Sequence, residues 1–352
     1  MLVRAIQEDF ENWPPDAWQE YRDALDVVNN WRGSHGYPLN TFQVNLRKVS
    51  RKFEDEPLIA QRIKRLVSIA LKLDRFPSMK LSQMQDLGGC RAILKNVRNV
   101  RFVSRYYLKK SNIKHHLASV DDYISRPKPS GYRGIHLVYR YYSDKQKQVF
   151  NGMKIEMQLR SKYQHAWATA VETVGMFSGQ ALKSSLGSQD WQRFFALMGS
   201  AIAMRENSAP VPDVPSSRGE LLPDLRDYVD RLKVEHRLRE YGNAVQSMTT
   251  NEQDAHYYLL HLDPAYGKLT ITGFMANEIE KANEKYAEAE QMVKANPGTD
   301  AVLVSVDSVN ALARAYPNYF ADTRLFTELM NQTLQGRSRG IPVSATKARP
   351  TQ

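Results

Sequence analysis

Side chains that could bind the phosphates of a nucleotide recur in four clusters along the chain. Phosphoryl chemistry on ATP needs carboxylates for magnesium, cations for phosphate oxygens, flat groups for the base, and a base for the attacking hydroxyl. The clusters are Arg62, Lys64, Ser68 and Lys72; Asp86 and Arg91; Lys128, Tyr132 and His136; and Glu156, Arg160 and His165. Neither a Walker A loop nor a kinase glycine-rich loop accompanies them.

Each cluster also has an ordinary structural interpretation. A helix with spaced basic residues is commonly a solvated surface, and Asp86 could cap the next turn. Tyr132 could be a loop aromatic and His165 a satisfied core histidine. Residue types and spacing alone therefore indicate only a basic protein that could bind nucleotides.

The elements that must position these residues follow from hydrophobic periodicity. Helices are expected over 15–32, from Asn40 as N-cap to Phe53, over 57–75, over 97–110 and from Ser161 past Trp167. Strands are expected within 87–94, over 135–142 and over 154–160. In the last strand the even-numbered residues, including Glu156, are all polar, so one face of the sheet would be a charged floor.

The C-terminal third has a different organisation. A stretch rich in proline and serine at 206–223 is typical of a loop or linker, and a charged helix at 224–247 follows it. A hairpin of 255–262 and 268–274, a helix at 276–295, a strand at 301–307 and a helix interrupted at Pro317 come next. We expect residues 1–205 to form the main domain, 206–249 a linker with a connecting helix, 250–335 a small α+β domain, and 336–352 a disordered tail.

The composition of the chain indicates which classes of partner it could bind. The 352 residues carry a net charge of +11, which favours polyanions such as nucleic acid or nucleotides. Four basic residues with a spacing of three and four would form a stripe on one helix face: Arg98, Arg101, Arg105 and Lys109. Such a stripe is as often a solvated face as a nucleic-acid contact. With one cysteine, Cys90, no apolar run of membrane-spanning length and no signal-peptide pattern, we expect a cytoplasmic protein without a membrane partner.

Four strings in this order strongly resemble the synthetase domain of the RelA/SpoT family over about residues 40–205. They are RIKRLVSIALKL, MQDLGGCRAIL, DYISRPKPSGYRGIHLV and IEMQLRSKYQHAWATAVE. The resemblance implies a mixed β-sheet flanked by helices, an α/β (α+β) fold of the nucleotidyltransferase-like kind. It also implies transfer of pyrophosphate from ATP, with Mg²⁺, to a ribose 3′-hydroxyl.

The resemblance assigns a role to each matched residue. Arg62 and Arg91 would sandwich the adenine of ATP, and Lys64, Ser68 and Lys72 would hold its phosphates. Asp86 and Glu156 would be the catalytic metal ligands, and Glu156 would also take the proton of the attacking hydroxyl. Tyr132 would stack the acceptor base, with Lys128, His136 and His165 also in the acceptor site.

The sequence departs from the housekeeping alarmone synthetases at two positions. Arg133-Gly134-Ile135 replaces their usual Gln-Ser-Leu. Val171 stands where a guanine-reading carboxylate is expected, and Glu172 follows one place later. No His-Asp dipeptide is present, so the hydrolase half of bifunctional relatives is not expected.

Two segments predict the acceptor of the pyrophosphate: NNWRGSHGYPLNTF near the N-terminus, and MQDLGGCRAIL. Both resemble the toxic small synthetases, which pyrophosphorylate the 3′-terminal adenosine of tRNA. A tRNA partner would also give the basic stripe a purpose. The alternative is an alarmone synthetase that makes (p)ppGpp or (p)ppApp from free nucleotides.

The C-terminal unit resembles the pseudo-zinc-finger antitoxin region of CapRel-type fused toxin–antitoxins, without cysteines to bind zinc. Tyr316 and Tyr319 form the Tyr-x-x-Tyr motif that this resemblance assigns to blockage of the ATP site until a phage capsid protein releases it. Alternatively, these rings pack only in their own core. Two further alternatives are a non-catalytic RNA-binding module and a toxin whose tail merely stabilises the fold.

Overall fold

The computed structural model describes residues 14–177, 189–244, 247–250, 255–296, 299–306 and 309–336. The helices are α2 (Pro15–Ser34), α3 (Gly36–Ser50), α4 (Leu66–Arg75), α5 (Val97–Lys109), α6 (Lys162–Phe177), α7 (Gln189–Arg205), α8 (Arg218–Arg231), α9 (Val234–Ala244), α10 (Ile279–Ala295), α11 (Val309–Ala315) and α12 (Arg324–Leu334). The strands are β1 (Leu58–Ile63), β2 (Gly88–Leu94), β3 (His116–Asp122), β4 (Ile135–Arg140), β5 (Lys154–Ser161), β6 (Ser247–Thr250), β7 (Tyr257–Asp263), β8 (Lys268–Phe274) and β9 (Asp300–Ser305). No helix within these ranges is long and apolar enough to cross a membrane.

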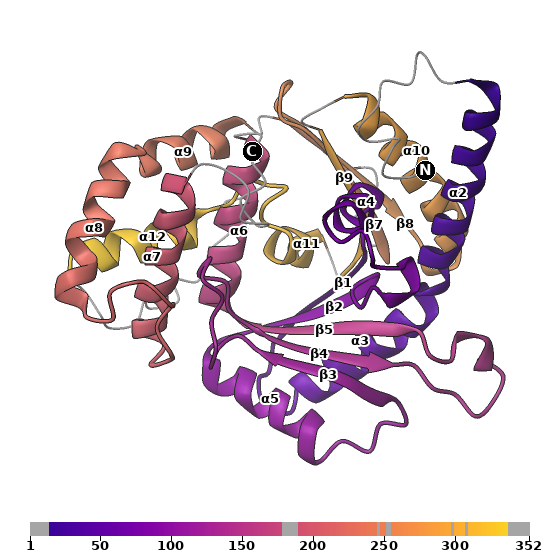
Figure 1. Cartoon of the computed structure of the whole chain (residues 1–352), viewed down its shortest axis with the longest axis horizontal. Helices are drawn as coiled ribbons and strands as arrows, with labels where there is room; N and C mark the ends of the chain where they lie inside the picture. The colour runs from indigo at the N-terminus through magenta and orange to yellow at the C-terminus, as the bar shows by residue number, and fades with distance from the viewer. Residues whose placement is uncertain are drawn as a thin grey trace, which may run out of the picture.

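All of the strands above join one mixed sheet, flanked by helices as the sequence predicted (Figure 1). Its order is β3-β4-β5-β2-β1-β9-β7-β8-β6. The pairs β2–β5 and β6–β8 are parallel and the others antiparallel. The C-terminal strands therefore continue the N-terminal sheet, because β9 pairs with β1 at Gln61 and Arg62.

The two faces of the sheet are chemically different. The odd residues of β5, Ile155, Met157 and Leu159, are fully buried in a core that also contains Val100 and Val103 of α5. Because side chains alternate along a strand, Glu156 and Gln158 point to the opposite face, on the side of α6 and α11 (Figure 1). The predicted alternation over 154–160 is thus confirmed.

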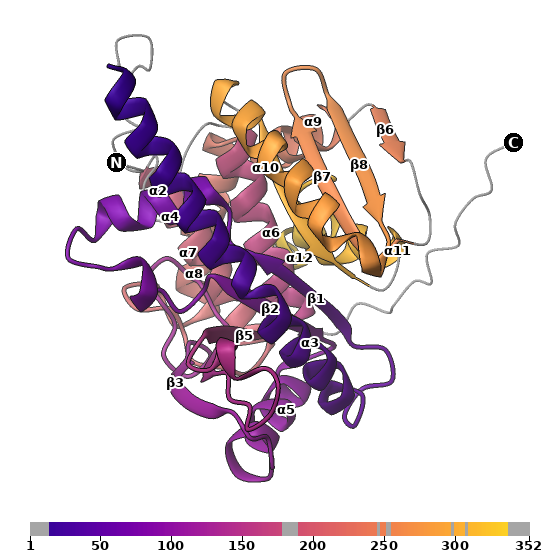
Figure 2. The same ribbon diagram turned by 90° about the vertical axis from the view of Figure 1, so that its right-hand side faces the viewer.

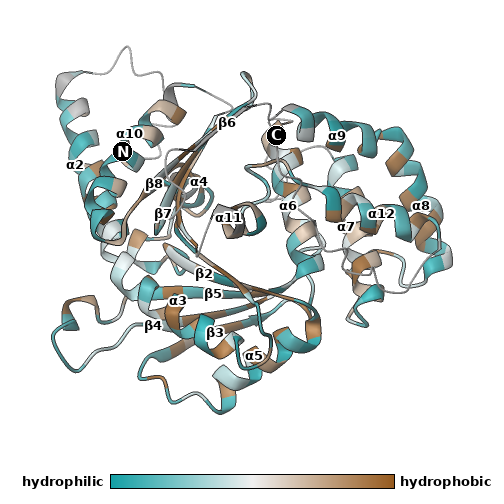
Figure 3. Cartoon of the chain, turned by 180° about the vertical axis from the view of Figure 1, so that it is seen from behind, coloured by the Kyte–Doolittle hydropathy of each residue, from teal (hydrophilic) through white to brown (hydrophobic). Residues whose placement is uncertain are grey.

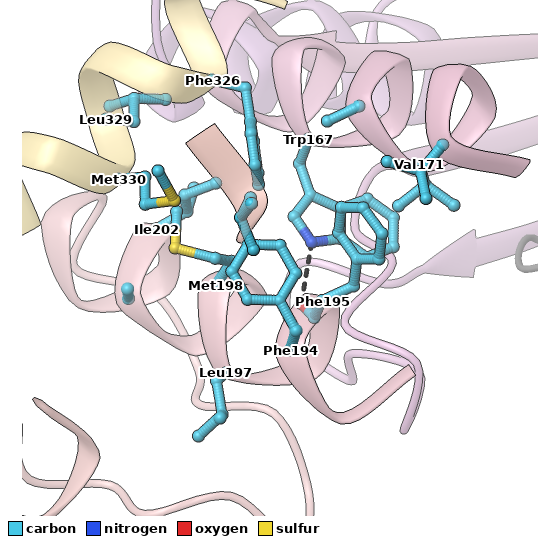
Figure 4. Packing of buried hydrophobic residues seen from close by; sticks show 14 of the residues in the cluster. Trp167, Val171, Phe194, Phe195, Leu197, Met198, Ile202, Phe326, Leu329 and Met330 are labelled. Carbon is cyan, nitrogen blue, oxygen red and sulfur yellow. Dashed lines mark hydrogen bonds between the residues drawn. The ribbon is translucent and has the colours of Figure 1, made fainter. Parts of the chain in front are cut away.

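A helical bundle of α6, α7, α8, α9 and α12 stands beside the sheet (Figure 1). Its core contains Trp167 and Phe195, and Trp167 Nε1 donates a hydrogen bond of 2.9 Å to the carbonyl of Phe195 (Figure 4). Phe326 of α12 is buried in the same core, far along the chain from the other members. In Figure 3 the hydrophobic residues gather along β7 and β8, whereas α9 is mostly hydrophilic.

Several local predictions were wrong. Residues 57–75 are a strand followed by a helix, because β1 gains hydrogen-bonded partners on both sides in β2 and β9. The second helix begins at Gly36 rather than after Asn40, since His35 joins it to the end of α2. The charged helix at 224–247 is two helices, α8 and α9, and α8 begins at Arg218 within the predicted loop. Strand β3 was not predicted. The predicted domain boundaries stay predictions, and the predicted tail from 337 onward lies outside the described residues.

The loop before β4 depends on a glycine. Gly131 has a φ of +92°, and a Cβ placed there would lie 2.7 Å from the carbonyl oxygen of Phe195 and 3.1 Å from the Trp167 ring. We expect Gly131→Ala to lower the free energy of unfolding by about 3 kcal/mol through backbone strain and overpacking. Gly152, with a φ of +87° and no neighbour within 4 Å, is the matched control. Gly152→Ala should cost about 1 kcal/mol. Equal losses for the two variants in urea unfolding would contradict this account.

Candidate active site

A carboxylate held by two lysines lies beside the start of α4. Lys64 Nζ is 2.8 Å and Lys72 Nζ 2.9 Å from the two oxygens of Asp86. Burial would raise the pKa of Asp86, but the charges and hydrogen bonds of both lysines outweigh it and lower that pKa to about 2. The predicted metal ligand and two predicted phosphate-binding cations therefore meet in one cluster, in which Asp86 offsets one of the two lysine charges.

A second polar network runs along the polar face of the sheet and centres on Glu156. His136 Nδ1 is 2.9 Å from Glu156 Oε1, and Gln158 Nε2 donates to Glu156 Oε2 at 2.5 Å. Tyr132 OH lies 2.5 Å from His136 Nε2, and Arg160 donates to Tyr132 OH at 2.8 Å. Burial would raise the pKa of Glu156, but the charge and hydrogen bond of His136 lower it. Glu156 is thus an ionised carboxylate that could accept a proton.

The remaining acceptor-site predictions fall close to this network. Lys128 Nζ lies 5.4 Å from the centroid of the Tyr132 ring and 4.4 Å from that of Tyr123. His165 Nε2 is 3.2 Å from the carbonyl oxygen of Arg314. Burial, with the nearby positive charges of Arg91 and Arg160, holds the pKa of His165 well below its usual value, so the ring is neutral and donates from Nε2.

Tyr316, at the end of α11, covers Arg91. The Arg91 guanidinium carbon is 4.2 Å from the centroid of the Tyr316 ring, and Arg91 Nη2 donates a 2.6 Å hydrogen bond to the carbonyl of Ala315. Tyr316 OH donates to the backbone carbonyl of Gln61 at 3.0 Å, and the ring is 1% exposed. Burial raises the pKa of Tyr316, and the positive charges of Arg91 and Arg62 oppose that rise.

Tyr319 is buried one turn further on. Its hydroxyl donates to Asp300 Oδ2 at 2.8 Å, and the same carboxylate forms an ion pair with Arg65. A cavity of about 330 Å³ adjoins it, lined by residues of both the predicted synthetase and the C-terminal unit. Arg62, Ser68 and Glu172 come from the former, and Asp300 and Tyr319 from the latter. Val171 also lines this cavity, and its side chain is buried in the helical core.

The basic stripe lies away from these groups. Arg98, Arg105 and Lys109 are exposed on α5, which packs on the apolar face of the sheet. Arg101 is neutralised by an ion pair with Asp122. The structure therefore brings together every predicted donor, acceptor, metal and regulatory residue, but places the predicted tRNA stripe on the opposite side of the sheet.

Some residues of this region were not predicted as site residues. Gln158 donates to Glu156, and the strict alternation of 154–160 could have revealed this role. Arg160 stood in the fourth candidate cluster without an assigned role, and the structure shows that it donates to Tyr132. No sequence pattern indicated Arg65 or Asp300, because the contact between them joins segments 235 residues apart.

Comparisons with known proteins agree with this location. Residues 61–176 match the model of a family described as the region found in RelA / SpoT proteins. The matched residues run from within β1, through α4, β2, α5, β3, β4 and β5, into α6. They include every predicted donor, metal and acceptor residue.

One curated relative is the GTP pyrophosphokinase YjbM of Bacillus subtilis (strain 168), 29% identical over 127 residues. The match covers 34% of this chain and 57% of that protein. Among solved structures, small alarmone synthetase 1 of Bacillus subtilis bound to its product pppGpp is 20% identical with a TM-score of 0.37, covering 60% of this chain and 94% of that one. Small alarmone synthetase 2 of the same organism is 18% identical with a TM-score of 0.42, covering 53% and 95%.

The Asp86 cluster predicts a pH dependence. The folded-state pKa of about 2 lies below the ordinary 3.8, so the ionised carboxylate stabilises the fold above pH 3.8, and this contribution disappears as pH falls toward 2. We expect Asp86→Asn to lower the free energy of unfolding by about 2 kcal/mol at pH 7. The difference from the unmodified protein should shrink between pH 4 and about pH 2. Asp227→Asn, at an exposed carboxylate of α8, is the control. A difference that stays constant with pH in urea titrations would contradict the assignment.

Proposed function

We propose that the protein is an ATP-dependent pyrophosphokinase that is switched off by its own C-terminal segment. One observation carries the proposal: Tyr316 stacks on Arg91 at 4.2 Å, where the adenine of ATP would otherwise lie. The groups needed for transfer are assembled next to it, on the polar face of the sheet. The RelA/SpoT region spans these groups and supports the same reaction class.

In the proposed step, a ribose 3′-hydroxyl oxygen attacks the β-phosphorus of ATP. The new O–P bond forms as the bond from that phosphorus to the α,β-bridging oxygen breaks, and AMP leaves. Glu156 takes the hydroxyl proton, and Gln158 and His136 orient its two oxygens. Tyr132, fixed by Arg160 and His136, would stack the acceptor base.

Two carboxylates are suited to Mg²⁺. Asp86 and Glu156 are hard oxygen ligands, and the negative charge of Asp86 lies close enough to Glu156 to act to raise its pKa. No cluster of three or more potential protein ligands occurs within the described ranges. This suits an ion that shares its coordination with substrate phosphates, since Mg²⁺ commonly takes only one or two protein carboxylates. The ion would neutralise charge on the transferred group.

The proposed acceptor is the 3′-terminal adenosine of tRNA, whose modification would block aminoacylation and translation. The net charge of +11 and the resemblance of the front end to toxic small synthetases support it. Val171 is buried where a guanine-reading carboxylate was expected, which weakens the case for GDP or GTP. By the resemblance of the C-terminal unit to CapRel-type fused toxin–antitoxins, a phage capsid protein would be the activating trigger, and the role would be anti-phage defence.

Synthesis of an alarmone from free nucleotides is the second candidate. The curated relative is named a GTP pyrophosphokinase. In addition, tRNA that contacted Arg98 and Arg105 would have to pass around the β3 edge to reach Glu156, because α5 covers the other face of the sheet. A free nucleotide faces no such constraint.

An activity assay separates the two candidates. Purified full-length protein is incubated with γ-³²P-ATP, magnesium and bulk tRNA, with and without GDP and GTP. We expect label on tRNA and none with Glu156→Gln, which keeps an amide at the position of the carboxylate but cannot accept the proton. Label on free nucleotide alone would establish alarmone synthesis. No label from the unmodified protein, from a Tyr316→Ala variant or in the presence of a phage lysate would reject the catalytic proposal.

The inhibitory role of Tyr316 has its own test. A desolvated cation–π contact contributes about 2 kcal/mol, so Tyr316→Ala should tighten ATP binding by at least about tenfold. Tyr316→Phe keeps the ring over Arg91 and loses only the hydrogen bond to Gln61, so its affinity should stay close to that of the unmodified protein. Isothermal titration calorimetry with the full chain measures both. If Tyr316→Ala leaves ATP affinity unchanged, the ring does not block the donor site.

A further inference from the structure

A second contact joins the C-terminal unit to the donor site, at some distance along the chain from Tyr316. Glu290 of α10 accepts a hydrogen bond of 2.7 Å from the backbone N–H of Leu66, the first residue of α4. It also forms a two-point ion pair with Arg32 of α2, at 2.8 and 3.1 Å. Both side chains of the ion pair are only 6% exposed. Helices α2 and α10 lie side by side in both views (Figure 1, Figure 2).

The groups that Glu290 engages adjoin the predicted donor site. Arg32 Nε donates to the carbonyl of Lys64 at 3.1 Å, and Lys64 is one of the two lysines on Asp86. Leu66 opens the helix that carries Ser68 and Lys72. Glu290 also lines the cavity that contains Ser68. The carboxylate is thus held at the phosphate end of the site, whereas Tyr316 is held at the end that would take the base.

The charges around Glu290 explain why it is held there. A helix N-terminus and a guanidinium both favour an anion. Burial and the adjacent Glu290 carboxylate raise the pKa of the Tyr286 hydroxyl, so this neighbour stays neutral. A second carboxylate of the same unit, Asp300, pairs with Arg65 in the same way. Two carboxylates from the C-terminal unit therefore face the basic segment from 62 to 66.

We propose that Glu290 is a second inhibitory contact, which holds the C-terminal unit closed by occupying Arg32 and the Leu66 N–H at the phosphate end of the donor site. This inference rests on the proposed ATP-dependent function and deepens its regulation. ATP and Glu290 place negative charge in the same region, so binding of the triphosphate competes with closure. Release of the unit then requires that both the aromatic contact and the carboxylate contact be broken.

The test uses ATP binding by the full-length protein, measured by calorimetry without reference to turnover. Glu290→Gln keeps an acceptor for the Leu66 N–H but removes the negative charge opposite Arg32. A charge-assisted hydrogen bond is lost, so we expect ATP affinity to rise about tenfold. Glu288→Gln, at an exposed position on the same helix that pairs with Lys285, is the matched control and should leave the affinity unchanged.

A double variant and a second measurement keep the proposal falsifiable. Glu290→Gln in a Tyr316→Ala background should tighten ATP binding further, because the two contacts are at different ends of the site. Hydrogen exchange in α10 should quicken in folded Glu290→Gln and not in Glu288→Gln. If Tyr316→Ala tightens ATP binding but Glu290→Gln does not, Glu290 is only a structural ion pair. If every variant binds ATP more tightly as expected yet none transfers pyrophosphate, the proposed reaction fails while the inhibitory contact stands.

Discussion

Strand β1 is the constraint on which the rest of the structure depends, because both of its edges are paired. On one side β2 brings Arg91 and Asp86 into place, and on the other β9 attaches the C-terminal strands at Gln61 and Arg62. One strand thus carries a predicted adenine-binding residue and the attachment point of the predicted regulator. Two residue pairs make the β1–β9 pairing, and side-chain contacts of Tyr316 and Glu290 also join the C-terminal unit to this part of the chain.

Those side chains are electrostatically complementary. The segment from 62 to 66 presents arginines, a lysine and the N-terminus of α4, all suited to phosphate oxygens. The C-terminal unit contributes Glu290, Asp300 and the face of the Tyr316 ring, which contact basic groups of the predicted synthetase. Anionic and aromatic groups are also what a nucleotide offers, so the contacts that the C-terminal unit makes here resemble those that a nucleotide would make.

The polar face of the sheet supplies Glu156, the carboxylate that would take a proton in the proposed reaction. Glu156 is fixed by Gln158 and His136, and Arg160 fixes Tyr132 in turn. This chain of hydrogen bonds leaves Glu156 little freedom to rotate, which favours catalysis because orientation does not have to be achieved during the reaction. The same arrangement places the exposed basic residues of α5 on the other side of the sheet from Glu156.

The sequence by itself determined the alternation of β5, the hairpin of β7 and β8, and the ordered motifs that predict a RelA/SpoT synthetase, because period-two patterns and motif strings are local. It could not determine that residues 58–63 form a strand, since the apolar and basic residues there also fit a helix until β2 and β9 supply hydrogen-bonding partners. The meeting of Glu290 with Arg32 likewise joins positions 258 residues apart. Tertiary structure alone decided these features, because they depend on which distant segments share a sheet edge or a buried charge.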